Sequence, residues 1–242
     1  MSLPKIDVPF FTLELPYSGL KVQFRPFTVK EEKILLFAQQ SQDMRQIALA
    51  IKQVAQNCIV NDVKLEDMFT FEVDFYFVKL RAVSVNNVIK LKVKDTYKEE
   101  DIFYDAELNL DEVELIKVKK TNNKIKLNDT YSIKLTFPKY GDIENVLSVL
   151  SEVNVGELTF SLIGQCIESV YSKDGEEVYM MSEYTQEERK DFLESLTTKN
   201  FKDIQDFITD IPALTHQLEY KTKDGEVKTK VLRGLFDFFS YA

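Results

Sequence analysis

The sequence predicts an α+β fold in which a mostly antiparallel β region lies between N- and C-terminal helical parts. Apolar residues recur every three or four positions early in the chain, which is typical of amphipathic helices. From Asn87 they alternate instead with lysines, and helical spacing returns after Gly141. We therefore expect three parts: a hairpin plus helices over 1–86, a β-rich region over 87–140, and a helical region with two β-hairpins over 141–242.

The first part begins with a predicted β-hairpin. Phe11, Leu13 and Leu15 alternate with polar residues, a turn signal follows at 17–19, and a second run of alternation leads to Pro26. Alternation on both sides of a short turn is the pattern of two antiparallel strands. The hairpin is expected to lead directly into a helix.

Three helices are expected after this hairpin. Thr28 and Glu31 have the spacing of a capping box, which predicts a helix at about 29–40. Asp43 is the expected N-cap of a second helix with a single apolar stripe. A third helix, rich in Phe and Tyr, is expected at about 72–83.

The β region is predicted from strict alternation. Apolar residues at 89, 91 and 93 alternate with Lys90, Lys92 and Lys94, which gives one buried face and one lysine-lined, solvated face. Glu99, Glu100 and Asp101 are expected in a loop. Further strands are expected around Val118 and Ile125, with a turn at Asn122–Asn123 between them, and over Tyr131–Phe137.

The last part combines helices with two hairpins. Apolar faces are expected over 143–150 and then over Phe160, Ile163, Ile167 and Val170, and a further stripe runs from Phe201 to Ile211. Thr185 and Glu188 repeat the capping-box spacing. Asp174–Gly175 and Asp224–Gly225 are turn signals for two β-hairpins.

The composition offers little catalytic chemistry. The seven glycines are scattered, so no phosphate-binding loop is present, and the serine-nucleophile motif is absent. His216 is the only histidine, and the two cysteines, Cys58 and Cys166, are too few for a disulfide framework or a cysteine-rich zinc site. Cys58 lies on the apolar stripe of the second helix and is interpreted as a buried thiol. We expect no catalytic residues, no metal site and no cofactor.

Three aspartates have helical spacing that a hard cation would accept. Asp203, Asp206 and Asp210 fall at i, i+3 and i+7, but a solvated polar helix face gives the same pattern, and we favour that interpretation. No apolar run approaches the roughly 20 residues needed to span a bilayer, so no membrane association is expected.

The distribution of charge suggests one candidate partner surface. The chain carries 31 basic and 40 acidic residues, whereas residues 79–140 alone have thirteen basic against ten acidic ones. Lys90, Lys92 and Lys94 would suit an acidic partner, although lysines also protect exposed strands from unwanted pairing, and this second interpretation is favoured. We do not expect nucleic-acid binding on this surface, because aliphatic residues, not aromatic ones, are interleaved with the lysines.

Two further candidate interface positions lie near the ends of the chain. Arg25 precedes Pro26 at the predicted strand-to-helix corner, and a structural and an interface role remain equally open for it. A helix over 232–241 would point Phe238 and Tyr241 away from the face that closes the core. Aromatic residues exposed in this way would form a partner anchor, while burial in the same fold is the alternative.

Three sequence blocks, Val22–Leu36, Lys79–Ser84 and Gly234–Phe239, together span nearly the whole chain. In their residues and order they resemble the T4-like phage baseplate proteins, a family that includes hub assembly factors. Asn86 and Asn87 stand where a glycine is expected, and the last hairpin, 218–232, lacks the cysteines of some relatives. A metal-ribbon role for that hairpin is therefore not supported.

The resemblance implies a non-enzymatic protein of the contractile-tail baseplate hub that acts through protein–protein contacts. Its expected partners are other baseplate or hub proteins, and a homo-oligomer is left open. It implies synthesis and assembly in the host bacterial cytoplasm, with the virion tail baseplate as the possible final location. A transient assembly chaperone that is absent from the virion is the alternative.

Overall fold

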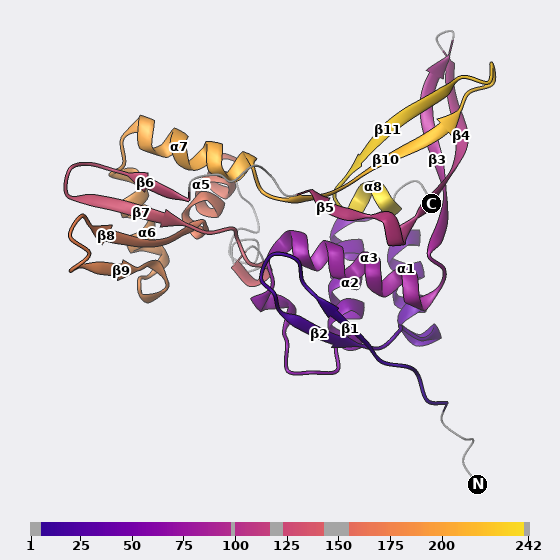
Figure 1. Ribbon diagram of the computed structural model, residues 1–242, viewed down its shortest axis with the longest axis horizontal. Coiled ribbons are helices and arrows are strands. Elements are labelled where there is room, and N and C mark those ends of the chain that lie inside the picture. Colours follow the sequence, from indigo (N-terminus) through magenta and orange to yellow (C-terminus); the bar gives the residue numbers. More distant parts are fainter. Residues whose placement is uncertain (1–5, 98–99, 117–122, 143–154, 240–242) are drawn as a thin grey trace. The chain divides into compact units, whose positions relative to one another are not determined.

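A computed structural model describes residues 6–97, 100–116, 123–142 and 155–239 (Figure 1). These residues form helices and small antiparallel sheets, which confirms the α+β class. The chain divides into two compact units: unit 1 contains 1–116 and 213–242, and unit 2 contains 117–212. The sequence suggested three consecutive parts instead. The structure divides differently because β10 (Ala213–Lys221) of the C-terminal hairpin pairs with β5 (Glu114–Ile116), a strand from the middle of the chain.

Unit 1 combines three helices with antiparallel strands. Its elements are β1 (Phe11–Glu14), β2 (Lys21–Phe24), α1 (Val29–Ser41), α2 (Met44–Cys58), the 3-10 helix η1 (Leu65–Asp67), α3 (Thr70–Ser84), β3 (Val88–Tyr97), β4 (Glu100–Asn109), the 3-10 helix η2 (Leu110–Glu112), β5 (Glu114–Ile116), β10 (Ala213–Lys221), β11 (Val227–Arg233) and α8 (Leu235–Phe239). The helix α3 is the most buried, with seven buried residues in four turns.

The N-terminal hairpin and the three predicted helices are confirmed. β1 and β2 pair antiparallel, and Gly19 in their turn has a φ of 71°, which only glycine adopts without strain. Glu31 Oε2 accepts hydrogen bonds from the Thr28 backbone N–H at 2.9 Å and from its hydroxyl at 2.6 Å. Asp43 accepts from the Arg45 backbone N–H at the start of α2. The first two helices therefore begin where their capping residues place them.

Two long hairpins of unit 1 lie side by side (Figure 1). β3 pairs with β4 over ten positions, so the expectation that Glu100 and Asp101 lie in a loop is wrong. β10 pairs with β11, which confirms the hairpin around Asp224–Gly225. The Tyr220 hydroxyl and the Lys228 ammonium group both donate to Asp95 Oδ2 at 2.9 Å. This carboxylate joins the two hairpins across more than 120 residues of sequence.

The chain leaves and re-enters unit 1 through neighbouring strands. β5 ends at Ile116, and β10 begins at Ala213 directly opposite it in an antiparallel pair. Unit 2 is therefore an insertion whose two ends are held together by the sheet β11-β10-β5. An insertion between closely spaced ends costs the host fold little chain entropy.

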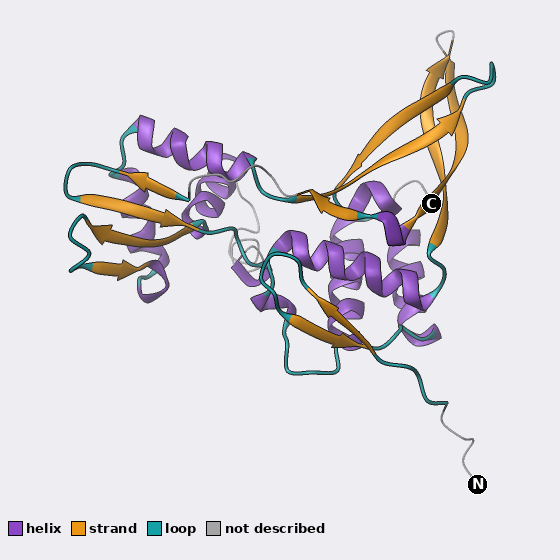
Figure 2. Ribbon diagram, viewed as in Figure 1, coloured by secondary structure: helices purple, strands orange, loops and turns teal. Residues whose placement is uncertain are grey.

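Unit 2 has a four-stranded antiparallel sheet with helices beside it (Figure 2). Its elements are β6 (Lys124–Lys126), β7 (Tyr131–Leu135), α5 (Val155–Gln165), β8 (Ile167–Ser172), β9 (Val178–Met180), the 3-10 helix η3 (Met181–Glu183), α6 (Gln186–Glu194) and α7 (Thr198–Thr209). The strand order is β6-β7-β8-β9, so β9 is at an edge. Ile133 on β7 is fully buried and marks a core within this unit.

Several predictions for unit 2 have clear outcomes. The strands around Ile125 and from Tyr131, the hairpin around Asp174–Gly175 and the helix after Thr185 are confirmed. The helical face expected to continue through Ile167 and Val170 is wrong, because α5 ends at Gln165 and these two residues lie in β8. The expected strand around Val118, the Asn122–Asn123 turn and the apolar face at 143–150 fall wholly or partly outside the described residues.

Candidate interaction surfaces

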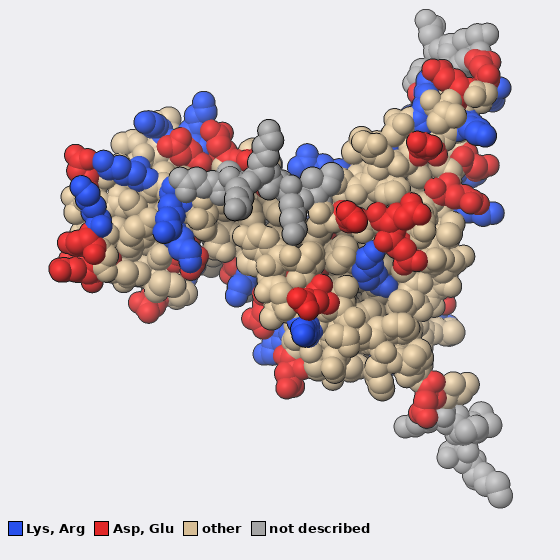
Figure 3. Space-filling view, viewed as in Figure 1, with Lys and Arg blue, Asp and Glu red and all other residues tan. Residues whose placement is uncertain are grey.

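The β3 lysines face solvent beside carboxylates of the same hairpin. Lys94 Nζ lies 2.6 Å from Asp101 Oδ2, and Lys90 Nζ lies 4.0 Å from Glu107 Oε1. Lys92 is exposed and stands opposite Asp105 in the strand register. Acidic and basic side chains are interspersed over these strands (Figure 3), so the three lysines do not form the purely basic surface that their sequence spacing suggested.

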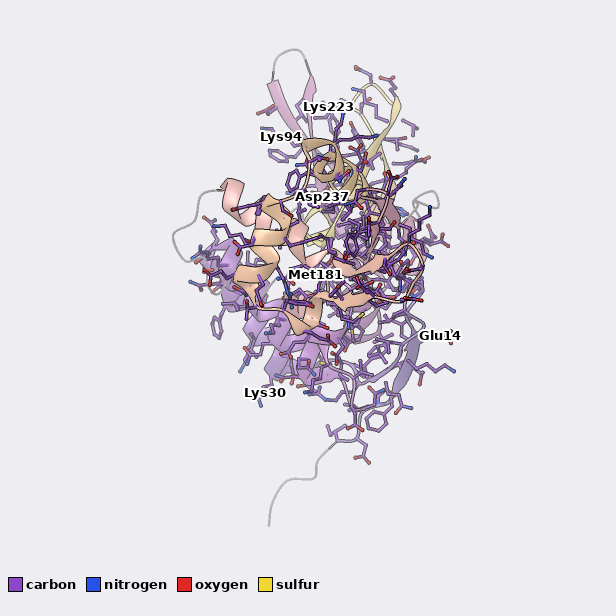
Figure 4. The ribbon with its side chains drawn as sticks, turned by 90° about the vertical axis from the view of Figure 1, so that its left-hand side faces the viewer. Glu14, Lys30, Lys94, Met181, Lys223 and Asp237 are labelled. Carbon is purple, nitrogen blue, oxygen red and sulfur yellow. The ribbon has the colours of Figure 1, made fainter. Side chains whose placement is uncertain are left out.

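The charged ends of the two hairpins also show this mixture. Lys94 and Lys223 lie toward the ends of the two hairpins (Figure 4). Lys223 is followed directly by Asp224, and both are exposed. The negative charge of Asp224 weakens the attraction that Lys223 would exert on an acidic partner.

Arg25 is engaged within unit 1. Its guanidinium group donates to Glu31 Oε1 at 2.9 Å, to the Pro26 carbonyl at 3.0 Å and to the Asn57 carbonyl at 3.3 Å. Burial of Glu31 opposes its charged form, but the hydrogen bonds from Arg25 and Thr28 outweigh burial and lower the pKa of Glu31 to about 2. These bonds give Arg25 a structural role at the strand-to-helix corner.

The C-terminal helix contradicts one predicted anchor residue. Phe238 is fully buried, so the expectation that it points away from the core is wrong. The physical reason is the helix start: Leu232 belongs to β11, Gly234 breaks the strand with a φ of 74°, and α8 begins only at Leu235. Leu235 and Phe238, three positions apart, then share the buried face. Tyr241 lies outside the described residues.

The three blocks that carry the family resemblance converge on α3. The Phe27 backbone N–H, in the first block, donates to Ser84 Oγ at 2.9 Å in the second block. The Leu235 backbone N–H, in the third block, donates to the carboxylate of Asp74 on α3. All three blocks lie in unit 1, and they hold its helices and its C-terminal segment together.

Lys79, also in the second block, fastens α3 to the chain after β4. Its ammonium group donates to the carbonyl oxygens of Leu110, Asp111 and Val113 at 3.1, 3.1 and 3.3 Å. Burial lowers the pKa of Lys79, while the charges of Asp111 and Glu114 act in the opposite direction. The role of this block is thus structural.

Apolar side chains of α1 and α2 are exposed to solvent. On α1, Val29 is 67%, Leu36 49% and Phe37 69% exposed. Their spacing of seven and eight residues places them on one side of the helix. Leu49 on α2, which packs against α1, is 61% exposed. Large apolar side chains exposed on two packed helices make this pair of helices a candidate protein interaction site.

Unit 2 contains an aromatic cavity that sequence reasoning missed. The cavity has a volume of about 620 Å³, and its lining includes Tyr131, Tyr179, Met181, Tyr184 and Phe192. These residues come from β7, β9, η3, the segment before α6 and α6 itself. The available signal was the run of tyrosines on both sides of the Asp174–Gly175 turn, but only the fold brings Tyr131 to the same site. Met181 is labelled in Figure 4.

Two tyrosines of the cavity lining are hydrogen-bonded to an acidic side chain. The hydroxyl groups of Tyr131 and Tyr179 each donate to Glu177 Oε2 at 3.0 Å. The Glu177 carboxylate raises the pKa of Tyr179 to about 12. Arg189 also lines the cavity, but its guanidinium group donates to the Tyr184 carbonyl and to Gln165 Oε1.

The groups first considered for catalysis are dispersed or buried. Cys58 and Cys166 are buried, and burial raises their pKa values to about 11 and about 12. His216 is half-buried on β10, opposite Leu232. Within the described ranges, no three His, Cys, Asp or Glu side chains come together as a possible metal site. None of the helices in these ranges has the length and the apolar character needed to cross a membrane.

The fold and its surfaces define an α+β protein with an inserted second unit and extensive exposed apolar and aromatic side chains. A family model described as "T4 bacteriophage base plate protein" matches residues 8–240, so the chain belongs to this family. No curated protein and no solved structure matched the chain. Family membership gives the protein a structural role in a phage tail, in contact with other baseplate proteins.

Proposed function

We propose that the protein acts without catalysis, in the assembly or structure of the baseplate hub, by binding other baseplate subunits. The exposed apolar residues of α1 and α2, Val29, Leu36, Phe37 and Leu49, carry this proposal. Apolar side chains at such exposure gain free energy when a partner removes them from water. The host cytoplasm is the proposed place of this assembly.

Variants of the exposed helix surface test the proposal. The double substitution Leu36→Ser and Phe37→Ser should leave the melting temperature of the isolated protein within a few degrees of wild type, because neither side chain is buried. The same variant should fail to support tail assembly in phage that lack the native gene. Normal infectivity of the variant phage would contradict an interface role for this surface. Lys30→Ser, an exposed change on the first turn of α1, is the control.

A permanent subunit and a transient chaperone differ in what finished particles contain. Mass spectrometry of purified virions should detect the chain in stoichiometric amounts if it is a permanent subunit. A chaperone should be required for assembly and absent from the particles. Normal tails from phage that lack the gene would contradict both roles.

Nucleic-acid binding through the β3 lysines is the weaker alternative. Because Lys90 and Lys94 are close to carboxylates of β4, we expect no shift of a single-stranded oligonucleotide even at low salt. A shift that weakens steeply with salt and is lost in Lys90→Ser/Lys92→Ser/Lys94→Ser would instead support it.

A further inference from the structure

We infer that the aromatic cavity of unit 2 binds an extended, basic segment of a partner protein, with an apolar side chain of that segment inside the cavity. This inference rests on the proposed function, because it supplies the contact by which a baseplate protein recognises one neighbour. Three features lead to it: the cavity, the exposed strand edge beside it, and the charge of its rim.

The cavity has the size and lining of a binding site. Its volume of about 620 Å³ lies within the roughly 300–1,000 Å³ of ligand pockets. Tyr131, Tyr179, Tyr184 and Phe192 present ring surface, while Met181 adds a side chain that adapts its shape. Such a lining favours an aromatic or large aliphatic side chain, because the burial of a large apolar surface gains the most free energy.

The edge of the sheet favours an extended partner. β9 pairs with β8 on one side and ends the strand order β6-β7-β8-β9. Val178, Tyr179 and Met180 are 56%, 37% and 36% exposed, so the whole strand is accessible. A peptide that adds to a sheet edge gains main-chain hydrogen bonds and directs alternate side chains to one face. Tyr179 of β9 lines the cavity, so a peptide paired with β9 would direct side chains toward the cavity at the level of Tyr179.

The charge of the rim selects a basic segment. Glu188 lines the cavity, and Glu177, which is outside the lining, accepts hydrogen bonds from two lining tyrosines, Tyr131 and Tyr179. Residues 173–188 contain six acidic side chains and one basic one. The cation in the lining, Arg189, is directed to Tyr184 and Gln165, and Lys126 nearby is paired with Asp129 at 2.6 Å. Lysine or arginine residues that flank the apolar anchor would therefore be attracted to this rim.

Overlapping 15-residue peptides that tile the other structural proteins of the same phage provide the probe. The full-length chain should bind a small set of peptides that share a large apolar residue flanked by Lys or Arg. Fluorescence anisotropy then gives their affinities at two salt concentrations. If no peptide binds, or if acidic peptides bind as well as basic ones, the inference is wrong.

Two kinds of variant separate the cavity from the rim. Ser195→Phe places a ring at an exposed position of the cavity lining and should weaken binding at least tenfold, whereas Ser182→Phe, outside the lining, should not. Glu176→Gln/Glu183→Gln/Glu187→Gln should weaken binding severalfold and reduce its salt dependence. Three exposed glutamates elsewhere serve as the matched control, in Glu66→Gln/Glu219→Gln/Glu226→Gln.

Further readouts keep the inference separate from the proposed function. Tyr179→Ala, at the exposed edge strand, gives a second cavity variant if Ser195→Phe lowers the melting temperature. If the wild-type chain is required for the baseplate while both cavity variants bind peptides and assemble normally, the cavity inference fails and the proposed function stands. If the chain is dispensable for tails, the proposed function fails even where peptides bind.

Discussion

Glu31 shows how a single buried carboxylate organises the strand-to-helix corner. It accepts hydrogen bonds from Arg25 and Thr28 and is only 3% exposed. Its folded pKa of about 2 lies below the ordinary value of 4.5. The stabilisation is therefore present above pH 4.5 and is lost as the pH falls toward 2. The corner should be among the first parts of unit 1 to weaken in acid.

Substitution of Glu31 should change how the free energy of unfolding depends on pH in the acid range. Glu31→Gln should cost about 2–3 kcal/mol in the free energy of unfolding at pH 7, since charge-assisted hydrogen bonds are lost around Arg25. Between pH 4.5 and 2 the variant should lose less stability than wild type. Urea unfolding at several pH values measures both effects, with the exposed Glu66→Gln as control. If variant and wild type lose the same free energy of unfolding between pH 4.5 and 2, this role of Glu31 is contradicted.

Asp74 has the opposite dependence on pH. Burial raises its pKa to about 7, against the hydrogen bond from the Leu235 backbone N–H. The folded state then holds a proton that the unfolded chain has released, so the stability contributed at this site falls as the pH rises from about 4 to 7. Asp74 should thus contribute most to the stability of unit 1 in mild acid, where its buried carboxyl group is protonated.

An amide at position 74 should remove this pH dependence. Asp74→Asn can still accept from Leu235 and carries no charge to bury, so we expect it to be more stable than wild type by roughly 2 kcal/mol at pH 8. Near pH 4 the two proteins should be similar. Thermal unfolding across this range provides the measurement. Equal stabilities at pH 8 would mean that the Asp74 carboxylate is already well solvated.

At the scale of elements, the Lys79 side chain joins α3 to η2. Lys79 donates to three backbone carbonyls around η2. Lys79→Met keeps the length of the side chain but leaves these acceptors without the ammonium group, at a cost of about 2–3 kcal/mol. Amide exchange in residues 110–113 should rise in this variant and not in Lys92→Met, whose lysine is exposed. A similar cost for both variants would show that η2 does not depend on the contact.

The predictable elements are those with strong local signals. Capping residues at Thr28, Asp43 and Thr185 fixed the starts of three helices. The glycines of both Asp-Gly turns have positive φ angles, 77° at Gly175 and 81° at Gly225, which other residues rarely adopt. In each case the physical cause acts within a few residues, so the sequence alone reveals it.

The missed features depend on contacts between distant residues. β4 does alternate, with Tyr104 and Leu108 buried and Phe103 exposed, but its acidic start suggested a loop. β8 has helical spacing and becomes a strand because it pairs with both β7 and β9. The aromatic cavity joins residues from 127 to 200. The site that we propose for a partner was therefore not predictable from local pattern.

At the scale of the whole molecule, the division into two units is explained by the two points at which the chain passes from one unit to the other. Ile116 and Ala213 are paired partners in one sheet, so the host unit can close its own strands regardless of what is inserted there. All three blocks that carry the family resemblance lie in unit 1, whereas the proposed peptide site lies in unit 2. We expect the first unit to provide the common framework and the second to provide the specific contact.

Separate cores predict that each unit responds to its own core mutations. Leu80 on α3 and Ile133 on β7 are both fully buried, and truncation of either to alanine should cost about 2–5 kcal/mol. Hydrogen exchange in the full-length chain should rise across β7 and β8 in Ile133→Ala and across α3 in Leu80→Ala, because local opening follows cooperative units. Exchange that rises equally in both units for either variant would show a single cooperative structure. Confinement to one unit would mean that the inserted unit can change its partner surface without unfolding the framework that carries it.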